Sequence, residues 1–279
     1  MTGRLHVQRL SLARLAPDLK STEPLIESPN LAPRQPVSAF RLEQGRLTHT
    51  PLFWGLTPPW LKVLDHAPHC ARAETLSKRA MFHEAFSARR CVIPVSGFYV
   101  WKPQARSKQP FLVTQVNRAP LLLGALWCRY HTTLTTFADS TALISVPANA
   151  CLSSLTDRLP VIIPPEALTQ WLDPSTDLSS LTPLLIPAPL ELLGAFPVSK
   201  HVNNPAYQSP SCAHPTGRCC AGPCHRSRNV TTYLRYSAPP QGAACRSRPD
   251  HQPALDSRPQ RMGGREPGGR CDHPQGEPV

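Results

Sequence analysis

Seven short apolar runs, each bounded by turn-forming residues, constrain most strongly what this chain can fold into. The runs are rich in leucine, β-branched and aromatic side chains, which are typical of strands. They lie at 52–54, 91–94, 98–101, 111–116, 121–127, 142–146 and 161–163. Strands at this density predict a β-rich domain.

Helical patterns are fewer. Residues 75–86 carry apolar side chains at three- and four-residue steps, and residues 165–172 open with Pro165 and Glu166, as a first helical turn prefers. Strands therefore dominate, with helices at intervals. We predict the α+β class, as a β-rich single domain with a few peripheral helices.

The composition changes after Gln208. Residues 209–279 are rich in Pro, Arg, Ser, Gly, His and Cys, contain no lysine and lack apolar periodicity. Such a segment buries too little apolar surface to offset its ordering entropy. We predict a folded domain at 1–208 and a disordered tail at 209–279. The tail is either a genuine extension or the product of a frameshift in GC-rich DNA, which would cost the domain its closing strand.

The charge favours a polyanionic partner. The net charge is +12 over the whole chain. Up to Gln208 there are 20 Lys+Arg against 13 Asp+Glu, a net +7, and the remainder has 10 against 5, a net +5. The domain is therefore basic in its own right, which fits nucleic acid. A basic surface that is merely solvated is the alternative.

The sequence gives little indication of membrane insertion or export. The nearest candidate span, 181–198, is interrupted by four prolines and Glu191, and no secretory signal is visible. Residues 4–14 are basic and free of acids, which fits a first strand or, alternatively, a mitochondrial presequence. We expect a cytoplasmic, nucleoid-associated monomer that does not bind membranes.

The cysteines form two groups. Those of the domain lie mostly in apolar context, which indicates buried free thiols in a reducing compartment. The tail group could offer soft ligands to zinc, but its spacing matches no paired ligand pattern. We predict no metal and no cofactor. The domain cysteines are Cys70, Cys91, Cys128 and Cys151, and the tail cysteines are Cys212, Cys219, Cys220, Cys224, Cys245 and Cys271. The candidate zinc ligands of the tail are Cys212, His214, Cys219, Cys220, Cys224 and His225.

Several motifs occur together and in a fixed order. They are MTGR (1–4), PNLAP (29–33), WGLTPPW (54–60), ARAET (71–75), RCVIP (90–94), GFYVWK (97–102), KQPF (108–111), LGALW (123–127), AN (148–149), DRLPVII (157–163) and VS (198–199). Over about three quarters of its length the chain resembles the SOS-response-associated peptidase (SRAP) family of abasic site processing proteins.

The resemblance implies a protein that binds single-stranded DNA containing abasic sites. In the family, an N-terminal cysteine freed of its initiator Met condenses with the ring-opened aldehyde and closes a stable thiazolidine, a covalent DNA–protein cross-link. The family takes its name from a peptidase activity attributed to the same site. Four reactive family positions are substituted here: the cysteine is Thr2, the asparagine of Asn-Ala-Arg is Cys70, the glutamate of Gly-Phe-Tyr-Glu-Trp is Val100, and the histidine of His-Asp-Arg is Thr156.

The substitutions predict weakened or lost catalysis. A free Thr2 amine still forms an imine with an aldehyde, but its hydroxyl is a poor second nucleophile and closure would give a labile oxazolidine. Cys70 is either a relocated thiol or a packing residue. Val100 and Thr156 are most simply structural replacements, because neither side chain serves as a base near neutrality.

The DNA-binding positions are retained. The resemblance places Arg4 and Arg72 on phosphates. Trp60 offers a stacking face for a base, whereas Trp54 fits core packing better. Arg158 is expected to pair with an internal carboxylate. The sequence thus predicts an abasic site processing protein of reduced activity. The alternatives are a non-catalytic pseudoenzyme of the same fold that binds single-stranded DNA, and a decaying gene product that folds poorly.

Overall fold

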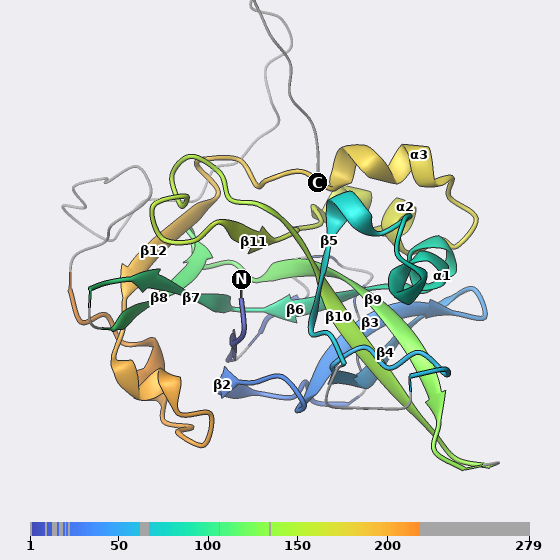
Figure 1. Ribbon diagram of the computed structural model, residues 1–279, viewed down its shortest axis with the longest axis horizontal. Coiled ribbons are helices and arrows are strands. Elements are labelled where there is room, and N and C mark those ends of the chain that lie inside the picture. The colour runs from blue at the N-terminus through green and yellow to red at the C-terminus, as the bar shows by residue number, and fades with distance from the viewer. Residues whose placement is uncertain are drawn as a thin grey trace, which may run out of the picture. The chain divides into compact units, whose positions relative to one another are not determined.

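The structure is a computed structural model that describes residues 2–8, 10–12, 16, 19, 21, 23–61, 67–105, 107–133 and 135–217 (Figure 1). The predicted disordered tail lies outside this range from residue 218 onward. The boundary at Gln208, however, falls inside the described fold. A 3-10 helix, η7 (Pro210–Ala213), follows it, and Cys212 is buried. Cys212 packs in one apolar cluster with Tyr99 and Phe196, which is why the ordered chain continues past the predicted boundary.

The described residues form twelve strands, and the prediction of a β-rich α+β fold is confirmed. The strands are β1 (Leu5–Val7), β2 (Ser28–Leu31), β3 (Pro36–Glu43), β4 (Arg46–Trp54), β5 (Cys70–Arg72), β6 (Arg90–Val95), β7 (Gly97–Pro103), β8 (Lys108–Gln115), β9 (Leu121–His131), β10 (Phe137–Pro147), β11 (Arg158–Pro160) and β12 (Leu193–Pro197).

The strands make two sheets. One has the order β12-β8-β7-β1-β2. In the other, the pairings β10–β4, β4–β3, β3–β6, β6–β9 and β9–β10 close a ring of five strands. The long strand β10 also pairs with β5 in parallel and with β11 in antiparallel orientation. Strand β10 therefore connects the short strands β5 and β11 to the ring.

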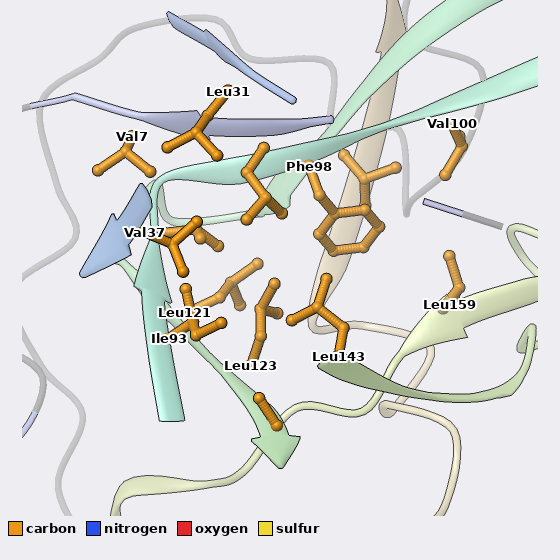
Figure 2. Close-up of a cluster of buried hydrophobic side chains, with 14 of the residues drawn as sticks. Val7, Leu31, Val37, Ile93, Phe98, Val100, Leu121, Leu123, Leu143 and Leu159 are labelled. Atoms are coloured by element: carbon orange, nitrogen blue, oxygen red, sulfur yellow. The ribbon is translucent and has the colours of Figure 1, made fainter. Parts of the chain in front are cut away.

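Side-chain alternation along the strands separates three apolar clusters. In β7, Phe98 and Val100 join the central cluster, whereas Tyr99 faces a second cluster beneath η6 and η7. In β6, Ile93 joins the central cluster, while Val92 faces the cluster covered by the helices. The central cluster draws on both sheets, as Figure 2 shows for a selection of its side chains.

Helices cover one side of the ring, where α1, α2 and α3 gather in Figure 1. Phe82, Ala85 and Phe86 of α1 are buried at three- and four-residue spacing and pack on that face. The helical elements are η3 (Ala73–Thr75), α1 (Ala80–Ala88), η4 (Pro165–Ala167), α2 (Leu168–Leu172), α3 (Leu178–Leu181), η5 (Thr182–Leu184), η6 (Lys200–Asn203) and η7. None of the helices in the described ranges is long and apolar enough to cross a membrane.

Three predicted elements differ from the structure in more than the length of a strand. The helix expected at 75–86 begins at Ala80. Thr75 O accepts the Lys78 and Arg79 N–H groups in a separate turn, and the extended backbone of Arg79 divides this turn from the helix. The strand expected at 161–163 is wrong. The regular pairing falls at β11, and Ile162 makes only an isolated bridge to Leu123. The helix expected at 165–172 is present as η4 followed by α2.

A glycine is required where β7 begins. Gly97 pairs with His6 of β1, and a Cβ atom at this position would lie 2.5 Å from Val113 O of β8. Because the obstacle is backbone, a larger residue would force the strands apart. Gly97 therefore fixes the strand that leads to Val100.

A charged network is buried in the ring. The Arg41 guanidinium lies 2.8 Å from an Asp139 carboxylate oxygen and 4.0 Å above the Trp127 ring. Arg129 reaches the same carboxylate, with Nε 2.8 Å from Oδ1. Asp139 therefore neutralises a guanidinium that is only 2% exposed.

Candidate functional site

Thr2 and Cys70 lie against one another. Thr2 is 2% exposed, and the Cys70 thiol donates a hydrogen bond to Thr2 O over 3.6 Å. The Thr2 hydroxyl oxygen is buried and has no hydrogen-bond partner among the described residues. The second residue of the chain is therefore held inside the protein by the first residue of β5, and it leaves a polar atom unsatisfied there.

The Cys70 thiol is protonated near neutrality. Cys70 opens β5, where it pairs with Leu143 of β10. Burial raises the pKa of Cys70 to about 12, although the positive charge of Arg158 acts in the opposite direction. Cys70 is partly buried and borders the central apolar cluster, so the packing role that the sequence left open is present. The contact with Thr2 also keeps the thiol in the site.

Val100 presents no polar atom to the site. It is 1% exposed and belongs to the central apolar cluster, with Phe98, Leu143 and Leu159. Figure 2 shows it at the end of that cluster, on the side of Leu159. The position at which the family has its glutamate is thus part of the core in this chain, and no proton can be exchanged there.

Thr156 uses its hydroxyl locally. Its Oγ1 donates to Arg158 O over 3.1 Å, and its backbone N–H donates to Leu152 O. The side chain therefore stabilises the turn that leads into β11. This contact agrees with the interpretation of Thr156 as a structural replacement.

Arg158 has the carboxylate partner that the sequence led us to expect, but this partner lies at the surface. Its two terminal nitrogens donate to both oxygens of Glu74 at 3.0 and 2.8 Å, and its Nε donates to Ser145 Oγ. Glu74 has a half-exposed side chain, so the expectation of an internal carboxylate is wrong. The hydrogen bond from Arg158 lowers the pKa of Glu74. The pair ties η3 to β11 and so fixes the strand that carries Cys70.

Arg4 turns inward. Its Nη1 donates to Gly3 O over 2.8 Å, its Nη2 lies 3.4 Å from Asn203 O, and its buried Nε has no partner among the described residues. Burial lowers the pKa of Arg4. A phosphate would have to compete with the backbone carbonyls for this guanidinium. Arg72, by contrast, lies at the end of β5 with its side chain exposed.

The two tryptophans differ as the sequence indicated. Trp54 is fully buried and its Nε1 donates to His69 O over 2.8 Å, which confirms the core role. Trp60 is 57% exposed. Its indole is free of core packing, so it remains a candidate stacking surface.

Three further polar residues shape the site, and the sequence interpretation assigned them no role. Asn30, fully buried, donates through Nδ2 to Val202 O, Asn204 O and Tyr207 O, and so holds the turn around η6. Asn203 on η6 accepts the Trp101 indole N–H at 2.7 Å and lies against Arg4. The third residue is His69. Asn30 lies in the PNLAP motif (29–33), which is the signal that could have identified it.

His69 brings a titratable ring to the site. The ring meets Trp54 edge to face, with centroids 5.9 Å apart. Burial lowers the pKa of His69, and the positive charge of Arg4 lowers it further. A neutral imidazole therefore precedes Cys70 directly. Only its adjacency to Cys70 in the sequence could have drawn attention to it. The described residues contain no group of His, Cys, Asp and Glu suited to a metal ion.

Taken together, the fold and the site define a β-rich domain in which Thr2 is buried against Cys70 of β5, while Arg4 contacts Asn203 of η6. Residues 1–205 match the family SOS response associated peptidase (SRAP). The chain belongs to this family.

The relatives and solved structures agree with this assignment. The chain is 31% identical over 185 residues to abasic site processing protein YoqW of Bacillus subtilis (strain 168), covering 65% of this chain and 83% of YoqW. It is 28% identical over 171 residues to abasic site processing protein YedK of Escherichia coli (strain K12), covering 58% and 73% respectively. A protein from Bordetella bronchiseptica has a similar solved structure, with a TM-score of 0.62 at 20% identity, covering 71% of this chain and all of that one.

Proposed function

We propose that this protein binds single-stranded DNA at abasic sites and condenses a free Thr2 amine with the ring-opened sugar aldehyde. The observation that carries the proposal is the burial of Thr2 against Cys70 within a family whose relatives include abasic site processing proteins. Removal of Met1 is required, because only then does Thr2 have a free α-amine.

The expected product is a reversible imine. The α-amine, with a reference pKa of about 8, is partly neutral at physiological pH and attacks the aldehyde carbon. The Thr2 hydroxyl is a weak second nucleophile, so closure to an oxazolidine gives little protection. Val100 and Thr156 offer no proton-transfer group, which makes the reaction slower than in a protein that has a carboxylate and an imidazole at these positions.

Surface charge and exposure support the DNA partner. Arg72 and Trp60 are both exposed and could contact a phosphate and a base respectively. The excess of basic residues up to Gln208 adds long-range attraction to a polyanion. We propose that the protein acts as a monomer at the nucleoid, and a peptidase activity follows from family membership as a further proposal.

A second candidate is a non-catalytic protein that binds single-stranded DNA. The burial of Val100 in the apolar core favours it, because the site lacks an acid or base at the position where the family has glutamate. In this case the fold shields the lesion without covalent chemistry.

Intact-mass analysis with an abasic single-stranded oligonucleotide, with and without borohydride, tests both candidates. Loss of Met1 and a DNA-sized mass increase after borohydride support the imine. DNA binding with no adduct under either condition supports the non-catalytic candidate. Absence of binding to abasic and undamaged single strands alike refutes both. Thr2→Cys serves as the positive control, since it restores the thiol of the family.

A further inference from the structure

The contact between Thr2 and Cys70 places two different nucleophiles in one buried site. The Cys70 sulfur lies 3.6 Å from Thr2 O. Three covalent bonds, which together measure about 4 Å, join that oxygen to the α-nitrogen of Thr2. The α-nitrogen of Thr2 therefore lies within about 8 Å of the Cys70 sulfur, although the two residues are 68 positions apart.

An independent observation marks the same place as a ligand site. The Thr2 hydroxyl oxygen is buried and has no hydrogen-bond partner in the described part of the chain. A buried hydroxyl without a partner destabilises the folded protein, because it has lost its hydrogen bonds to water. A polar ligand such as the ring-opened sugar, which carries several hydroxyl groups, would satisfy it.

We propose that Thr2 and Cys70 together form a split nucleophile, in which the Thr2 amine forms the imine with the abasic aldehyde and the Cys70 thiol then adds to it. The inference rests on the proposed function, because it needs the abasic aldehyde in this site. The product is an N,S-acetal that bridges the Thr2 nitrogen and the Cys70 sulfur through the sugar C1 carbon.

The two steps balance without an oxidant or reductant. In the first, the amine forms a C–N bond with the aldehyde carbon, and the carbonyl oxygen leaves as water. In the second, the S–H bond adds across C=N: sulfur bonds to carbon, and the thiol proton passes to the nitrogen. Burial raises the pKa of Cys70 to about 12, so the thiol brings its proton with it and the basic imine nitrogen receives it.

The fold must hold the bridge closed. A single cysteine closes a five-membered ring whatever the rest of the protein does, whereas Thr2 and Cys70 are joined only through the folded chain. Their effective concentration therefore depends on the native structure. Unfolding is expected to return the bridge to the imine and then to free aldehyde.

A chase experiment tests the proposal. Protein that begins at Thr2, verified by intact mass, is incubated with a fluorescent abasic single strand. Excess methoxyamine is then added to capture released aldehyde, and the remaining adduct is fixed with borohydride at intervals. The adduct is expected to persist at least about tenfold longer than in Cys70→Ser. Cys151→Ser, which alters another half-buried free thiol, should match the unchanged protein. Concentrated urea should abolish the difference.

The outcomes separate the two proposals. Equal lifetimes of the unchanged protein and Cys70→Ser, with both trapped by borohydride, overturn the split nucleophile and leave the imine intact. Absence of any trapped adduct in the unchanged protein overturns the proposed condensation itself.

A second measurement does not depend on the folding of a variant. Alkylation of the native adduct should spare Cys70 and still label Cys151, relative to protein with undamaged DNA of the same sequence. The comparison is made under alkylation conditions that label Cys70 when the DNA is undamaged, and equal labelling of Cys70 with abasic DNA then contradicts the bridge.

Discussion

Replacing Asn30 with alanine should loosen the η6 turn and destabilise the domain. The Asn30 amide nitrogen lies 3.2, 2.9 and 3.2 Å from the carbonyl oxygens of Val202, Asn204 and Tyr207. An amide group has two hydrogens, so one of the three contacts is shared. Loss of two buried hydrogen bonds, with carbonyls left unsatisfied, costs about 2–4 kcal/mol. For a domain of this size the melting temperature should fall by roughly 4–16 °C.

Thermal denaturation and hydrogen exchange measure the two parts of this prediction. The backbone N–H groups of Val202, Asn204 and Tyr207, which bond within the turn, should exchange faster in Asn30→Ala, while amides of β9 and β10 follow global unfolding alone. Asn117→Ala is the matched control, because that exposed asparagine accepts only the Ala119 N–H within the turn between β8 and β9 and should cost less than about 1 kcal/mol.

A melting temperature within 1–2 °C of the unchanged protein, together with unchanged exchange across 199–207, would refute this reasoning. Such a result would mean that the carbonyls find water or other donors at no net cost. Faster exchange with little change in melting temperature would place the loss in a local opening, and the estimate for global stability would then be wrong.

Three further changes test the fold and its charges. Gly97→Ala should destabilise the domain by about 1–3 kcal/mol in urea denaturation, because its Cβ would lie 2.5 Å from Val113 O; equal midpoints contradict the close approach. Asp139→Asn should cost about 3–5 kcal/mol, since it removes the nearer counter-charge of the 2% exposed Arg41 and leaves only the partly exposed Glu43, 3.3 Å away; a loss below 1 kcal/mol would show that Glu43 and water satisfy the guanidinium. The pKa of Glu74 is lowered by its arginine partner, so the pair stabilises above the unfolded pKa of about 4.3 and this contribution is lost as pH falls through the lower folded value. Because Glu74 is half-exposed, Glu74→Gln should cost only about 0–1 kcal/mol at pH 7 and show a smaller acid dependence, measured by melting at pH 7 and pH 3.

At the site, the order of the motifs indicates the family, whereas the contacts between its residues come from the structure. The order of the motifs identified the family and predicts four substituted positions, but it assigned no contact between Thr2 and Cys70. That contact arises because β5 pairs with β10 while the segment before β1 enters the protein. Likewise, Arg4 was expected on phosphate, whereas the structure directs its guanidinium to Gly3 O and Asn203 O.

Local patterns along the chain are enough to predict the character of the fold. The short apolar runs predict strands. In β9 leucine occupies successive positions, which is typical of a strand buried on both faces, and each face of β9 meets a different apolar cluster. The sequence also fixes which groups these positions can offer: a hydroxyl and no thiol at Thr2, and no polar atom on the side chain of Val100.

Contacts between residues that are distant in sequence depend on tertiary packing. Strand pairing is non-local, so neither the ring closure through β10 nor the hold of Asn30 on residues 202–207 is encoded in any local pattern. The same is true of burial: Trp54 and Trp60 flank one short motif, yet one is fully buried and the other 57% exposed. Local sequence sets which side chains are available, and packing between distant segments sets which of them meet.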